Sequence, residues 1–203
     1  MPTYKLTYFN GRGFGEITRM IFKQAGVEFE DVRLERDEWT KMKEKGGTPF
    51  GQLPILEVDG KVLSQSLAIA RFAARETGLQ GKTSFDQAIA ESAVEAVSEV
   101  FRAQITAHFE KDEAKKAVLQ EKFNTETRPA FHSNMSKLIA GDWIVGNSVT
   151  WADLLLLNYF DALPEEIKNE IRKSYPKFAK VVDNVAALPN IAKWVKERPV
   201  TEF

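Results

Sequence analysis

Tyr8 is the first residue of the chain whose type and position suit chemistry. It lies near the end of the apolar run KLTYF, directly before the glycine-containing segment NGRG. A phenol donates one O–H and also accepts hydrogen bonds. At the end of a strand it is either a packed core aromatic or a hydrogen-bond donor to a ligand. The residues alone leave both interpretations open.

Trp39 and Lys43 form a second candidate site. They are four residues apart on an expected short helix and therefore share a face. The indole N–H and the ammonium group are both donors and offer no acceptor. The pair therefore suits a carboxylate, with a solvated lysine beside a packing tryptophan as the alternative.

A third candidate lies where the strand ending near Gln65 passes into a helix opened by Ser66. Free N–H groups and the positive end of the helix dipole would attract an anion there, although a plain helix cap has the same sequence. Most X–Pro bonds are trans, whereas a cis Leu53–Pro54 bond would turn the backbone of Leu53 outward. Two anion-attracting positions flank this backbone edge, near Tyr8. The arrangement suits a short extended peptide with a carboxylate at each end.

Other patterns in the chain indicate no further site. The segment GRGFG lacks the last glycine of a dinucleotide loop, because residue 16 is Glu16. His108 and His132 have no partner at metal-ligand or catalytic spacing. The absence of cysteine excludes disulfides, thiolate–metal sites and a CxxC redox pair. We therefore expect no metal and no cofactor.

The composition is that of an ordinary globular protein. The 203 residues are 43 % apolar and 28 % charged, and the net charge is −1. This balance gives no sign of nucleic acid or an anionic membrane as partner. The N-terminus lacks the apolar segment of a signal peptide, and the run Leu154–Leu157 is too short to cross a bilayer. We expect a cytoplasmic protein.

The elements that must position these residues fall into two halves. The first half is expected to contain strands at residues 4–9 and 28–34, a helix at 14–25, a short helix capped by Asp37 and running through Lys45, a hairpin through Asp59–Gly60, and a helix from Ser66 closed by Gly78. The order βαβαββα predicts a sheet whose first two strands are parallel. From about residue 83 the chain shows only helical periodicity, with a capping box at Thr150–Asp153. The fold class is therefore α/β followed by all-α.

Five motifs carry a resemblance to a known family. YKLTYFNGRG, the Trp39/Lys43 pair, GQLPIL, QSLAIARF and VTWAD occur in this order. Together they resemble the sigma class of glutathione S-transferases, most of all the nematode enzymes and the glutathione-dependent prostaglandin D synthases. The resemblance implies a thioredoxin-like, glutathione-binding domain at residues 1–79, an all-helical domain at 80–203 that contributes the electrophile site, and a homodimer.

The resemblance also implies roles for individual residues. Tyr8 would donate its O–H to the sulfur of glutathione and favour the thiolate. The remaining implied contacts are the glycyl carboxylate at Trp39 and Lys43, the cysteinyl backbone at Leu53 with cis Pro54, the γ-glutamyl carboxylate at Gln65 and Ser66, and the groove wall at Gly51 and Gln52. Glu99 of a partner subunit is the candidate for the γ-glutamyl ammonium.

The electrophile pocket is expected between the domains. Phe9, Gly13 and Phe14 would line it, and Phe203 would help to close it. Many relatives have arginine at the position of Phe14, where it supports the tyrosine. Phenylalanine has no charge and no side-chain hydrogen bond to offer, so Tyr8 would either be less assisted here or be supported by another group. Phe50 would either anchor the partner subunit or pack within its own domain.

The expected function is conjugation of glutathione, as co-substrate, to small hydrophobic electrophiles in detoxification. One alternative is isomerisation of a prostaglandin endoperoxide by the same thiolate. Another is a non-catalytic protein that carries haem or a different apolar ligand, or a lens-type structural relative.

Overall fold

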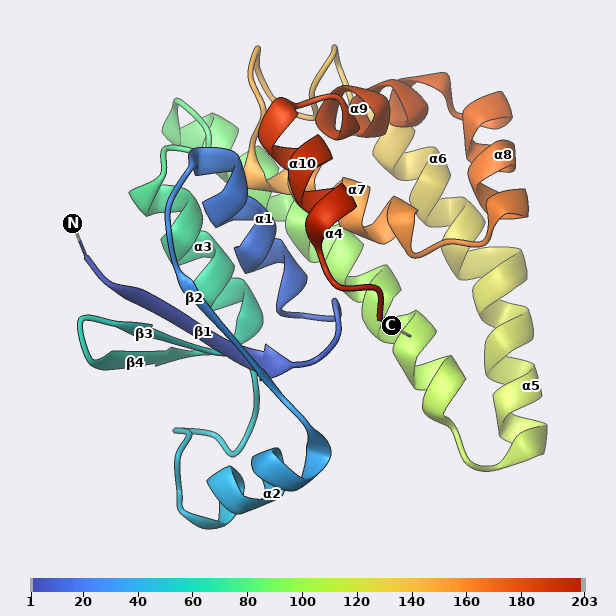
Figure 1. The fold of residues 1–203 in the computed structure, drawn as a ribbon. Coiled ribbons are helices and arrows are strands. Elements are labelled where there is room, and N and C mark those ends of the chain that lie inside the picture. Colours follow the sequence, from blue (N-terminus) through green and yellow to red (C-terminus); the bar gives the residue numbers. More distant parts are fainter. Residues whose placement is uncertain (1, 202–203) are drawn as a thin grey trace. The chain divides into compact units, whose positions relative to one another are not determined.

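The structure is a computed structural model that describes residues 2–201, and it divides into two units (Figure 1). Unit 1 comprises the residues up to Gln80 together with those from Ala187 onward, and unit 2 comprises Gly81–Ala186. The first boundary lies next to the expected end of a domain at residue 79. The expected helical domain 80–203 differs from unit 2, because the last helix of the chain packs in unit 1.

Unit 1 has the expected order βαβαββα, followed by the last helix. Its elements are β1 (Tyr4–Phe9), α1 (Glu16–Ala25), β2 (Glu30–Leu34), α2 (Arg36–Glu44), β3 (Ile55–Val58), β4 (Lys61–Ser64), α3 (Ser66–Glu76) and α10 (Pro189–Glu197). The strand order is β2-β1-β3-β4. β1 pairs with β2 in parallel, as predicted, and β3 pairs with both β1 and β4 antiparallel. The thioredoxin-like arrangement is confirmed.

Apolar periodicity positions the helices of unit 1. Helices α1 and α3 pack against each other on one face of the sheet (Figure 1). Ile17, Met20 and Ile21 of α1 are buried, as is Ile69 of α3, and Leu6 of β1 is fully buried beneath them. Helix α10 packs against α1. The carboxyl end of β1, which carries Tyr8, is thus held by a packed core.

Two predicted helix caps are wrong. The N-cap of α2 is Glu35, not Asp37, because the Glu38 carboxylate reaches back to accept the N–H of Glu35 at 2.8 Å and starts the helix earlier. Ser66 is already the first residue of α3, and Gln65 takes the N-cap position with a φ of 74°. The N–H of Ile69 donates to the carbonyl oxygen of Gln65 at 2.9 Å, which closes the first turn one residue before the expected cap.

Unit 2, Gly81–Ala186, contains helices and their connections and no strand, as predicted. The helices are α4 (Ser84–Phe109), α5 (Glu113–Lys122), the π-helix η1 (Phe123–Thr127), α6 (Arg128–Leu138), α7 (Trp151–Asp161), α8 (Glu165–Ser174) and α9 (Pro176–Ala186). Helix α7 forms the centre of the unit and packs against α4 and α9. The predicted capping box of α7 is present, and its Asp153 is fully buried.

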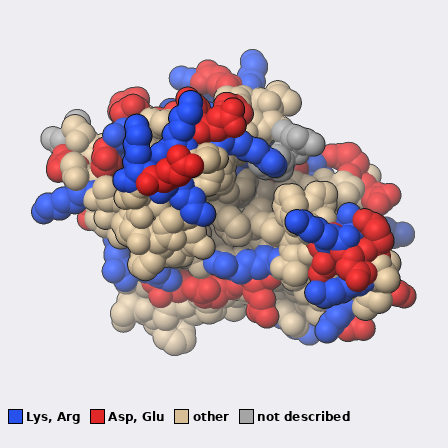
Figure 2. Space-filling view, turned by 90° about the horizontal axis from the view of Figure 1, so that it is seen from below, with Lys and Arg blue, Asp and Glu red and all other residues tan. Residues whose placement is uncertain are grey.

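The surface carries both signs of charge. Figure 2 shows acidic and basic side chains interspersed over the face that it draws, in keeping with the net charge of −1. Within residues 2–201, no helix has both the length and the apolar character that crossing a membrane requires.

Candidate functional site

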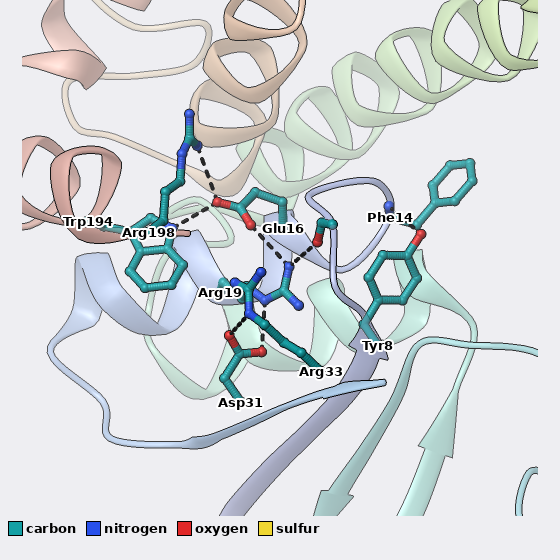
Figure 3. Close-up of polar contacts among 9 residues, drawn as sticks. Tyr8, Phe14, Glu16, Arg19, Asp31, Arg33, Trp194 and Arg198 are labelled. Carbon is teal, nitrogen blue, oxygen red and sulfur yellow. Dashed lines mark hydrogen bonds and ion pairs between the residues drawn. The ribbon is translucent and has the colours of Figure 1, made fainter. Parts of the chain in front are cut away.

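Tyr8 lies one residue before the end of β1 and is only 8 % exposed. Its hydroxyl oxygen accepts the backbone N–H of Phe14 at 3.1 Å (Figure 3). Burial raises the pKa of Tyr8, and the Phe14 N–H and the charge of Arg19 oppose that rise. The phenol is therefore protonated near neutral pH. Because its oxygen accepts from the backbone, its hydrogen is available for a ligand.

The glycine turn after β1 packs directly on the phenol of Tyr8. A Cβ added to Gly13 would lie 2.5 Å from the Tyr8 hydroxyl oxygen, and one added to Gly15 would lie 2.6 Å from Cδ1 of the ring. Gly13 also has a φ of +36°, which favours glycine. The turn therefore needs glycine for close approach to Tyr8, as well as for its backbone conformation.

A buried charged cluster lies beside Tyr8 (Figure 3). The Arg19 side chain on α1 is fully buried, and its Cζ lies 5.9 Å from the centre of the Tyr8 ring. Its Nε donates to Asp31 at 2.9 Å, and its Nη1 donates to the carbonyl of Gly11 at 2.6 Å and to Glu16 at 3.2 Å. One buried guanidinium thus ties β2 and the glycine turn to the helix that follows Tyr8.

Glu16 joins this cluster to the end of the chain. Its Oε1 accepts the indole N–H of Trp194 at 2.8 Å and Nη1 of Arg198 at 3.2 Å. Sequence reasoning missed the whole cluster. Glu16 and Arg19 are three apart on one helix, and this spacing was the available signal. Trp194 lies 178 residues further along the chain, and no local pattern predicts that contact.

The residues expected at the glycyl end of glutathione make two separate sets of contacts. The Phe9 ring makes edge-to-face contacts with Tyr8, at 5.4 Å between ring centres, and with Trp39, at 6.0 Å. Lys43 and Gly51 also lie together, since a Cβ on Gly51 would be 3.6 Å from Cε of Lys43. The structure therefore brings Trp39 next to the aromatic pair that includes Tyr8, and Lys43 next to the loop before β3.

The residues expected at the γ-glutamyl end also meet. Nε2 of Gln65 donates to Oε1 of Gln52 at 3.3 Å, and both side chains are exposed. Ser66 follows at the first position of α3, where backbone N–H groups lack helical partners. The Leu53–Pro54 peptide bond is cis, as the family resemblance implied and the bare statistics of proline did not.

Of the residues expected to line the electrophile pocket, the structure describes Phe9, Gly13 and Phe14, which all belong to unit 1. Phe14 is half-buried, and its backbone N–H donates to the Tyr8 hydroxyl. Phe9 is half-buried as well, and Phe203 lies outside the described residues. Glu99 is exposed on α4. Phe50 is 66 % exposed, so its ring is not packed into its own unit.

The structure buries one histidine, His132, among aromatic side chains. His132 is 1 % exposed and its Nε2 lies 2.9 Å from the Tyr159 hydroxyl, within an aromatic cluster of unit 2. Burial lowers the pKa of His132 to about 4. Within residues 2–201, no group of three or more His, Asp or Glu side chains is placed to hold a metal ion.

Comparison with known proteins gives consistent matches over the whole chain. Residues 4–75 match the glutathione S-transferase N-terminal domain and residues 98–198 the C-terminal domain. Glutathione S-transferase 1 of Ascaris suum is 42 % identical, with 100 % of both chains covered. Hematopoietic prostaglandin D synthase of Gallus gallus is also 42 % identical, with 99 % of each covered. Na-GST-3 of the hookworm Necator americanus, described as monomeric, is 37 % identical with a TM-score of 0.86, over 99 % of this chain and 100 % of that one.

Proposed function

This chain belongs to the glutathione S-transferase family and is a glutathione transferase, and from this premise we propose that Tyr8 activates the glutathione thiol for attack on small hydrophobic electrophiles. The observation that carries the proposal is the hydrogen bond from the Phe14 N–H to the Tyr8 hydroxyl oxygen. It fixes the oxygen and leaves the O–H to be donated to sulfur. A hydrogen bond that favours the thiolate lowers the pKa of the thiol.

The size of the effect follows from acid–base equilibria. A free thiol with a pKa near 8.5 is only a few per cent ionised at pH 7. A decrease of about two units corresponds to about 2.7 kcal/mol and ionises about three quarters of the thiol. The more stable thiolate is a weaker nucleophile, with a Brønsted slope of about 0.4–0.5, so ionisation alone gives only about a threefold gain in rate. Holding sulfur and electrophile together must supply the rest.

Glutathione is proposed to lie across the two residue groups of unit 1 described above. Trp39 and Lys43, beside Gly51, would bind the glycyl carboxylate through N–H donors. Gln52, Gln65 and Ser66 would bind the γ-glutamyl end, supported by the free N–H groups that open α3. The backbone of Leu53, with Pro54, would pair with the cysteinyl residue. The electrophile would approach the sulfur beside Phe9, Gly13 and Phe14, with Phe203 as a further expected pocket residue.

A pH titration of thiolate ultraviolet absorbance tests this proposal. The chain has no cysteine, so every thiolate signal comes from glutathione and none from the protein, and the signal of free glutathione is subtracted. We expect a midpoint one to two units below that of the free thiol. Tyr8→Phe should raise the midpoint and lower turnover while leaving glutathione affinity within about twofold. An unshifted wild-type midpoint would mean binding without activation and would favour the carrier function.

Prostaglandin endoperoxide isomerisation is a second candidate, supported by the similarity to the chicken prostaglandin D synthase. It would use the same thiolate, so Tyr8→Phe does not distinguish the two activities. Incubation with a prostaglandin endoperoxide and glutathione does distinguish them, by analysis of the prostaglandin product.

The sigma class, a role in detoxification, a cytoplasmic location and a homodimer belong to the same proposal. The sequence motifs support the class, and exposed Phe50 supports a partner subunit. The monomeric description of the hookworm relative makes light scattering the necessary check.

A further inference from the structure

The guanidinium of Arg19 lies in the interior of unit 1, next to the Tyr8 ring. It is fully buried, and its Cζ lies 5.9 Å from the centre of the ring that carries the Tyr8 hydroxyl. Its Nη2 is buried without a hydrogen-bond partner among residues 2–201. A buried donor left unpaired costs free energy and calls for an explanation. The position suggests that this cation acts on the phenol.

The two carboxylates around Arg19 also bind other cations, so they do not neutralise the charge of Arg19 completely. Asp31 shares its second oxygen with Nε of Arg33 at 2.9 Å. Glu16 shares its second oxygen with Arg198, at 3.2 Å, and with the Trp194 N–H. Each acidic partner is thus divided between two cations. Part of the positive charge of Arg19 therefore remains to act on Tyr8 in a region that water does not screen.

We propose that Arg19 is a positioning residue of the reaction: its buried guanidinium, held by Glu16 and Asp31, acts through Tyr8 to stabilise the negative charge of the bound thiolate. The inference rests on the proposed role of Tyr8. It bears on the departure at Phe14, because a cation on α1, five residues further along the chain, lies beside the same phenol. The negative charge of Glu16 offsets part of the positive charge of Arg19. Because Trp194 on α10 donates to Glu16, this helix also influences the charge that acts on Tyr8.

The charges of the cluster predict shifts of opposite sign. Arg19→Met, of similar length but neutral, should raise the thiol midpoint of bound glutathione by about 0.5–1 pH unit. Glu16→Gln and Asp31→Asn remove negative charge from the same cation, so each should lower the midpoint by about 0.3–0.5 unit. A purely structural role would loosen the site in every variant and would move all midpoints toward that of free glutathione.

Lys5→Met is the matched control. It also removes one positive charge from unit 1, but from the half-exposed ion pair with Glu57. Lys5 is three residues before Tyr8 on β1, so it lies about 10 Å away and points to the opposite face. Solvent and salt screen a charge at that distance. The midpoint should stay within about 0.1 unit of wild type.

The experiment is the thiolate titration of each variant saturated with glutathione, with thermal unfolding to verify the fold. Opposite shifts for Arg19→Met and the two acid variants support the inference. Unchanged midpoints, or shifts in one direction only, overturn it. If Arg19→Met does not fold, a fall in midpoint in Glu16→Gln and Asp31→Asn supports the inference, and a rise or no change overturns it. An unshifted wild-type midpoint would instead refute the role of Tyr8.

Discussion

Gly13→Ala probes the close contact between the glycine turn and the Tyr8 phenol. The new methyl group would lie 2.5 Å from the hydroxyl oxygen and 3.1 and 3.2 Å from two ring carbons. The Tyr8 ring is buried and cannot swing into solvent. Relief therefore requires the hydroxyl or the turn to move by about 0.5–1 Å, and a displacement of that size costs up to about a hundredfold in rate.

The stability change has two parts. The φ of +36° at Gly13 is unfavourable for alanine by about 1–2 kcal/mol. The clash with the phenol adds about 1–3 kcal/mol, as overpacking of a buried site typically does. Gly26→Ala separates the two parts, because Gly26 has a φ of +67° and nothing within 4 Å of the new methyl group. It should lose only the backbone contribution and retain full activity.

The assay is steady-state conjugation of glutathione to a chromogenic aryl halide, together with the thiolate titration and urea unfolding. We expect kcat/KM of Gly13→Ala to fall about 10- to 100-fold and its thiol midpoint to rise, while Gly26→Ala matches wild type in both. If Gly13→Ala retained wild-type turnover and midpoint despite a normal fold, Tyr8 would not be the activating group, or its position would not matter.

Three further predictions concern stability and assembly. Because burial lowers the pKa of His132 to about 4, the unfolded chain binds a proton that the folded chain excludes between about pH 6.5 and 4. The free energy of unfolding should fall by up to about 3 kcal/mol as the pH drops through that range, and His132→Gln should flatten this dependence in urea titrations. Asp153→Asn should cost about 2–4 kcal/mol in chemical unfolding, since the buried carboxylate accepts the N–H groups of Ile144 and Thr150 at 2.8 and 2.7 Å. The same change in the exposed capping box at Asp86 should cost about 1 kcal/mol or less. If the chain dimerises through Phe50, Phe50→Ser should reduce the mass by half in light scattering, whereas the similarly exposed Phe109→Ser should not.

Much of the fold could be predicted because its signals are local. The alternation of β1, the apolar stripe of α1 and the Asp59–Gly60 turn each depend on neighbouring residues, and the structure has the corresponding elements. The capping box at Thr150 and Asp153 is local as well. The N-caps Glu35 and Gln65 were missed because glutamate and glutamine are not among the preferred cap residues, and the backbone geometry places the caps there nonetheless.

Some features of the candidate site are likewise local in the sequence, and others depend on the tertiary structure. From the sequence by itself came Tyr8 beside a glycine turn, the Trp39–Lys43 spacing and the motif order that resembles one family. Only the tertiary structure decided that the Tyr8 hydroxyl accepts from Phe14, that Gln52 meets Gln65, and that Glu16 joins Arg19 to Trp194 on α10. The reason is physical: periodicity and turn chemistry act over a few residues, whereas partners in a buried charge cluster are chosen by packing, which brings together segments that lie far apart in the chain.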